Sequence, residues 1–139
     1  MKTLLLASLF AATAAAAAPT LETGSGDWSN IPMMRPQGSA TVDVDVITAM
    51  ISLVDSGECV IPGQRPGRID MRVPFLAQYD AQGSARRLVV RPSGCARADG
   101  LLAGEVQRMV EGRIFRPTGE DQEGWFRGQI AFSYTRETE

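Results

Sequence analysis

The chain has 139 residues, of which 14 are basic and 16 acidic, so its formal net charge is −2. This length suits one domain with a modest core, and the slightly acidic balance excludes the basic footprint of a nucleic-acid-binding protein. Histidine is absent, which excludes Ser-His-Asp triads, Cys-His dyads and imidazole metal ligands.

Residues 1–17 have the layout of a secretory signal peptide, in which Lys2 precedes an apolar run and a track of small residues. We place the cleavage after Ala17, because signal peptidase disfavours Pro19 directly after the cut. The alternative is an uncleaved membrane anchor, but residues 3–18 are shorter than the ~20 apolar residues that a spanning helix needs. The sequence therefore predicts an exported, periplasmic protein with no membrane span after cleavage.

Residues 18–40 are rich in Gly, Pro, Ser and Thr and show no hydrophobic period, which predicts an extended arm ahead of a domain at residues 41–139. We expect Trp28, or Met33 and Met34, to hold this arm against the domain rather than to bind a ligand.

Residues 41–57 carry two patterns. Valines alternate with Asp43 and Asp45, as in a strand, but a longer match has helical spacing and ends at Gly57. We therefore favour a helix. The two aspartates would be a metal-binding or acid–base pair in a functional interpretation; we favour a solvated first helical turn instead.

Two cysteines, Cys59 and Cys95, are present. An even number in an exported protein usually forms disulfides, whereas a redox pair favours Cys-x-x-Cys and a structural zinc site needs four ligands. The sequence predicts a Cys59–Cys95 disulfide that is structural rather than reactive.

A strand, a hairpin turn at Gly83 and a returning strand around residues 85–91 come next, because the first strand has six apolar residues at every second position. Asp99 is the predicted N-cap of a helix that ends at Gly112. A last strand follows, with aromatic and aliphatic residues facing inward. The six alternating residues are Ile69, Met71, Val73, Phe75, Ala77 and Tyr79.

This order, strand-strand-helix-strand, predicts an α+β fold: a three-stranded antiparallel sheet with helices packed on one face. If the helical crossover skips a position, the first strand is central and the other two are edges. Pro74 would then lie mid-strand, where we expect a bulge.

From about Arg68 to Tyr134, the chain resembles the C-terminal domain of TonB-like energy transducers. The residues that carry the resemblance are Gly83, Pro92-Ser93-Gly94, Ala98-Asp99, Phe115-Arg116-Pro117, Gly124 and Phe132. TonB itself keeps an anchor with a functional histidine and a long Pro-rich spacer, and this chain has neither the histidine nor the spacer. It therefore resembles a stand-alone, exported form of that domain.

The resemblance implies a non-enzymatic periplasmic module, linked to envelope transport, that binds an extended peptide by adding it to an exposed sheet edge. A segment of a TonB-dependent outer-membrane receptor is one such partner. The last strand is the expected edge, although a short charged edge is also typical of a protected one. The residues expected to bind the partner are Arg127, Gln129, Ile130, Ala131 and Ser133.

Two alternatives remain. One is a structural or self-associating envelope protein, because open sheet edges favour homodimers. The less favoured one is a small hydrolase with paired carboxylates, but Glu120, Asp121 and Glu123 lie in a loop with no apolar run beside them to raise a pKa. The sequence predicts no cofactor and no metal.

Overall fold

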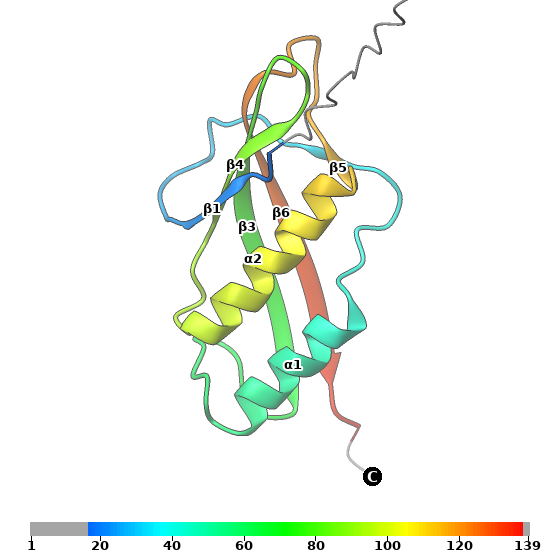
Figure 1. The fold of residues 1–139 in the computed structure, drawn as a ribbon. Coiled ribbons are helices and arrows are strands. Elements are labelled where there is room, and N and C mark those ends of the chain that lie inside the picture. Colours follow the sequence, from blue (N-terminus) through cyan, green and yellow to red (C-terminus); the bar gives the residue numbers. More distant parts are fainter. Residues whose placement is uncertain (1–16, 138–139) are drawn as a thin grey trace, which may run out of the picture.

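The computed structural model describes residues 17–137, so nearly all of the predicted signal peptide lies outside the described residues. The fold is α+β, with two helices on one face of a sheet (Figure 1). No helix within residues 17–137 has the length and hydrophobicity to cross a membrane. The elements are β1 (Thr20–Thr23), β2 (Arg35–Pro36), α1 (Val44–Asp55), β3 (Arg68–Tyr79), β4 (Ala85–Val90), α2 (Ala96–Glu111), β5 (Phe115–Arg116) and β6 (Gly124–Thr135).

The main sheet has four strands in the order β1-β4-β3-β6, so the prediction of three antiparallel strands is wrong. The three predicted strands do pair antiparallel with β3 in the centre, as expected. The fourth strand, β1, comes from the arm and pairs parallel to β4, with Thr20 opposite Arg87. Therefore β4 is not an edge, and the sheet is mixed.

The core face of β3 is as predicted, since all six alternating residues from Ile69 to Tyr79 are buried. The turn at Gly83 is also confirmed: its backbone φ is 77°, and the Asp80 N–H donates to the Ser84 carbonyl at 3.0 Å. The bulge expected at Pro74 is absent between β3 and β6, where the register runs through Pro74 opposite Gln129 without a shift.

Pro74 is tolerated in β3 because its nitrogen, which has no hydrogen to donate, faces away from β6. The Arg91 N–H donates to the Pro74 carbonyl at 3.0 Å, just beyond the last β4 pair, so the proline nitrogen faces the end of β4 rather than β6. The one register shift on β3 lies instead between Gln78 and Tyr79, beside the hairpin turn.

Residues 44–55 are helical, as favoured, because Asp43 caps α1 by accepting from the Asp45 N–H at 2.8 Å. The predicted start of α2 is wrong: the N-cap residue is Cys95, and Asp99 lies one turn inside. Asp99 instead accepts from the Ser93 N–H and hydroxyl, both at 2.6 Å, and so holds the preceding turn. Gly112 is the C-cap, as predicted.

Candidate functional site

The arm wraps around the half of the sheet that contains the hairpin. After β1 it crosses the face opposite the helices: the Arg91 side chain donates to the Gly26 carbonyl at 2.8 Å, and its guanidinium stacks 4.5 Å from the centre of the Trp28 ring. The arm then reaches the opposite sheet edge. There the side chain of Arg127 donates to the Ile31 carbonyl at 2.8 Å.

At that edge the arm pairs with β6 like a short parallel strand. The Arg127 N–H donates to the Pro32 carbonyl at 2.8 Å, and the Met34 N–H donates to the Arg127 carbonyl at 2.7 Å. Arg127 was one of the residues expected to bind a partner, and the chain itself already uses both of its backbone groups.

Met34 anchors this turn of the arm in the core, while its neighbour Met33 is 52% exposed. The Met34 methyl carbon lies 3.0 Å from the position that a Cβ on Gly128 would take, and the Tyr79 hydroxyl donates to Met34 Sδ at 3.4 Å. Burial raises the pKa of Tyr79 to about 12. Of the predicted anchors, Trp28 and Met34 therefore hold the arm, and Met33 does not.

The rest of β6 is an open edge. Backbone groups of a strand in an antiparallel sheet point alternately to its two sides. Since Arg127 points its groups away from β3, so do Gln129, Ala131 and Ser133, and none of these three has a backbone hydrogen-bond partner among residues 17–137. All three are exposed. Ile130 points its groups to Val73 of β3 and belongs to the ladder.

The side chains of β6 divide between two surfaces. Phe126, Ile130 and Phe132 are buried under the helices, whereas Gln129, Ala131 and Ser133 are exposed on the opposite face. In Figure 1 α1 crosses in front of the lower part of β6, which is the last strand in the sheet order. A strand added there would therefore have open solvent on one face and the helix layer on the other.

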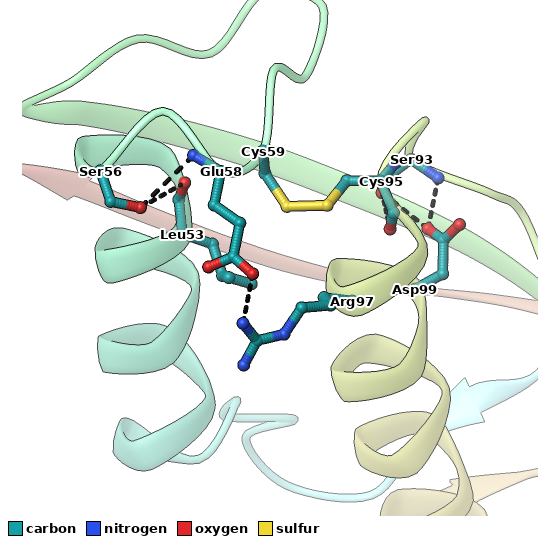
Figure 2. Close-up of a disulfide and its surroundings, with 8 residues drawn as sticks. All are labelled: Leu53, Ser56, Glu58, Cys59, Ser93, Cys95, Arg97 and Asp99. Atoms are coloured by element: carbon teal, nitrogen blue, oxygen red, sulfur yellow. Dashed lines mark hydrogen bonds and ion pairs between the residues drawn. A yellow bond between two sulfur atoms is a disulfide. The ribbon is translucent and has the colours of Figure 1, made fainter.

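The predicted disulfide between Cys59 and Cys95 is present, with 5.5 Å between the two Cα atoms. Figure 2 shows that it joins the chain just after α1 to the first residue before α2. Glu58 and Arg97 form an ion pair beside it. No free cysteine occurs within residues 17–137, so the sulfur atoms serve to fix the ends of the two helices together.

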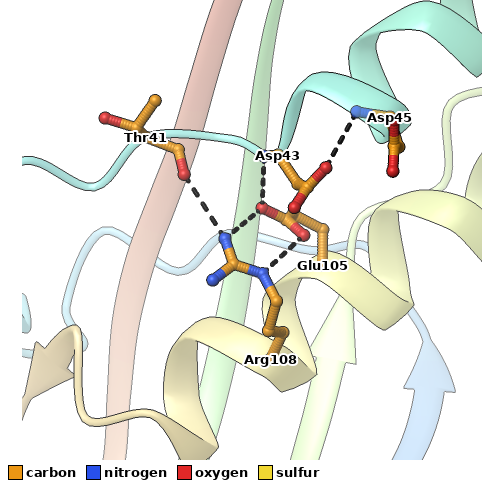
Figure 3. Close-up of polar contacts among 5 residues, drawn as sticks. All are labelled: Thr41, Asp43, Asp45, Glu105 and Arg108. Carbon is orange, nitrogen blue, oxygen red and sulfur yellow. Dashed lines mark hydrogen bonds and ion pairs between the residues drawn. The ribbon is translucent and has the colours of Figure 1, made fainter.

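A buried carboxylate, which the sequence reasoning missed, joins α2 to the start of α1. Glu105 of α2 is only 3% exposed and accepts from Arg108 Nε at 3.0 Å, from Arg108 Nη2 at 2.6 Å and from the Asp43 N–H at 2.8 Å (Figure 3). The hydrogen bonds from Arg108 lower the pKa of Glu105, and desolvation opposes them. The sequence does carry a sign of this contact: Glu105 lies within the apolar stripe of the helix, three residues before Arg108.

The three acids of the β5–β6 loop, Glu120, Asp121 and Glu123, are all exposed. The nearest hollow, of about 750 Å³, is lined by Arg35, Arg113 and Arg116 together with Glu111, and none of the three loop acids lines it. Nor do any three His, Cys, Asp or Glu side chains of residues 17–137 form a group that could hold a metal ion.

The open part of β6 is therefore the site that this geometry defines, with outward backbone groups at Gln129, Ala131 and Ser133. Comparison of the chain with protein-family models, with curated proteins and with solved structures finds no match.

Proposed function

We propose that this protein is a non-enzymatic, periplasmic interaction module that binds an extended peptide by strand addition to the open part of β6. The observation that carries the proposal is the row of three outward-pointing backbone positions, Gln129, Ala131 and Ser133, which have no partner within residues 17–137. Backbone hydrogen bonds from such an edge supply affinity, and alternate side chains supply specificity.

The arm supports the proposal, because it pairs with the same edge. Pro32 and Met34 form two backbone hydrogen bonds with Arg127, two residues before the open part begins at Gln129. The arm thus shows that a parallel segment pairs with this edge of β6 at Arg127. A peptide at Gln129–Ser133 would continue the row of hydrogen bonds that the arm starts.

The resemblance to TonB C-terminal domains gives the class of partner. The resemblance rests on the chain order strand, strand, helix and last strand, and residues 68–134 follow this order with β3, β4, α2 and β6. A segment of a TonB-dependent outer-membrane receptor is the peptide that it implies. The disulfide is compatible with export to an oxidising compartment.

Proline substitution tests this site. Gln129→Pro removes an N–H that the fold does not use, so the variant should fold and lose at least about tenfold in affinity, or about 1.4 kcal/mol. Ile130→Pro removes a donor to β3 and should destabilise the domain instead. Circular dichroism reports the fold, and fluorescence anisotropy reports binding of a labelled receptor segment.

Gln129→Ala is the matched control, because it removes the side chain and keeps the N–H. It should bind within about twofold of the wild type if backbone pairing dominates. A folded Gln129→Pro protein that binds as tightly as the wild type would rule out this edge.

A further inference from the structure

The strand next to the open edge carries a row of alternating charges. Arg72, Asp70 and Arg68 of β3 are exposed on the face opposite the helices. In the register of the sheet they lie opposite Ala131, Ser133 and Thr135 of β6. None of the three charged side chains takes part in an ion pair among residues 17–137. We call these three residues the charge track.

We infer that the peptide bound at β6 carries an acidic, a basic and an acidic side chain at alternate positions, in register with the charge track. This inference rests on the proposed function and adds the chemistry of the ligand to it. The pattern reads the same in both directions, so it holds for a parallel and for an antiparallel peptide.

The distances allow these contacts. An added strand lies about 4.8 Å beyond β6 and therefore about 9.6 Å from β3. An extended arginine covers most of that distance, and a glutamate on the peptide covers the rest. The β6 side chains between them at Arg72 and Asp70 are Ala131 and Ser133, which are small and leave the path across the sheet surface open.

The charge track is held in place from its other side. Beyond Phe75, β4 no longer pairs with β3, and the carboxamide of Gln64 takes its place beside Asp70. Gln64 Nε2 donates to the Asp70 carbonyl at 2.9 Å, and the Asp70 N–H donates to Gln64 Oε1 at 2.7 Å. The backbone at Asp70, the middle residue of the track, is thus hydrogen-bonded on the side away from β6 before any ligand arrives.

A second copy of this chain fits the track less well than a charged peptide. If two β6 strands paired edge to edge, the side chains that the second copy laid beside the track would be those of its own exposed residues. These are Gln129, Ala131, Ser133 and Thr135, none of which is charged. Backbone pairing would be satisfied, but the three charges would gain no partner.

The experiment compares three blocked peptides in the same alternating valine frame, with Glu-x-Lys-x-Glu, Gln-x-Gln-x-Gln or Lys-x-Glu-x-Lys at the variable positions. We expect the first to bind about 3- to 10-fold more tightly than the second, and the third to bind most weakly. The protein has a net charge of −2, so non-specific attraction would favour the third peptide and give the opposite order.

Arg72→Glu is the decisive variant, since it reverses one charge of the track at an exposed position. It should keep its circular dichroism spectrum and lose the preference for the first peptide over the second. The preference of the wild type should also shrink when the salt concentration rises from about 50 to about 500 mM.

The outcomes separate the two proposals. Equal affinity for all three peptides, abolished by Gln129→Pro, would overturn the inference and leave the edge site standing. Binding that Gln129→Pro does not affect, or no binding of any peptide, would overturn both. Dimers in light scattering that Gln129→Pro dissociates would assign the edge to a second copy instead.

Discussion

The two halves of β3 are stabilised in different ways. From Phe75 to Tyr79 the strand lies between β4 and β6, and the arm crosses the face behind it. From Arg68 to Val73 its only partner strand among residues 17–137 is β6, and on the other side Gln64 bonds Asp70 and Arg65 bonds Arg68. The half at Phe75–Tyr79, which we call the first half, is covered by the arm. The half at Arg68–Val73, the second half, is bonded on that side by a side chain instead.

The difference explains why an open edge can exist. The contacts that hold the second half lie between the helices or at the strand ends: the disulfide, the Glu105 cluster and the ion pair of Asp55 with Arg136. None of them uses the outer backbone of β6 at Gln129, Ala131 or Ser133. The domain therefore keeps this end together without covering the edge.

The largest effect should come from the disulfide. Replacing Cys59 and Cys95 together by alanine opens a loop with a sequence separation of 36, which should lower the free energy of unfolding by about 3–4 kcal/mol. Urea denaturation measures it, with intact mass before and after reduction as the check on the bond. A loss below about 1 kcal/mol would mean that the helix ends stay together without the bond.

Met34→Ala should destabilise the first half by about 2–4 kcal/mol, because it empties a buried site under Gly128 and Tyr79. Met33→Ala changes the neighbouring residue, which is 52% exposed, and should cost less than about 0.5 kcal/mol. Thermal denaturation compares the two variants. Similar losses from both would show that the arm is not anchored where we describe.

Gly128→Ala tests the same contact from the side of β6. A Cβ there would lie 2.5 Å from the ring of Phe75 and 3.0 Å from the Met34 methyl group, so we expect a loss of about 1–3 kcal/mol from overpacking. Gly104→Ala is the control, since nothing lies within 4 Å of its Cβ position in α2. It should stabilise the helix by about 0.5–1 kcal/mol, and urea denaturation should give the two substitutions opposite signs.

Glu105→Gln should cost about 1–2 kcal/mol at pH 7, because it weakens the hydrogen bonds to Arg108 and Asp43. The pKa of Glu105 is lowered in the folded protein, so its contribution is present above its usual value of 4.5 and is lost as the pH falls through the folded pKa. The gap between wild type and variant in urea denaturation should therefore close in acid. A constant gap from pH 7 to pH 3 would assign the loss to packing.

The hairpin, both helices and the core face of β3 could be predicted because each has a period or a turn residue that local chemistry imposes. The strands β1, β2 and β5 could not. They have four, two and two residues and are too short to show alternation. They are strands because of their partners: β1 pairs with β4, and β2 pairs with β5. Likewise, Met34 and Met33 are indistinguishable until the position of Gly128 is known.

The open edge could be predicted in outline but not in detail. The sequence indicated that the last strand is an edge, and its alternation indicated which side chains face out. The pairing with β3 decides whether Gln129 or Ile130 points its N–H to the open side of β6. Arg127 is not available to a partner because it bonds the arm, through a contact between residues 96 apart in the sequence. Neither leaves a local trace.

The wrapped arm also fixes the order in which this domain can become complete. Glu22 and Arg87 are 65 residues apart, and Ile31 and Arg127 are 96 apart, whereas the hairpin closes between Asp80 and Ser84. Contacts between distant residues form slowly because long loops must close first. The segment that is synthesised early therefore docks late, and it cannot finish until β6, the final strand, is in place.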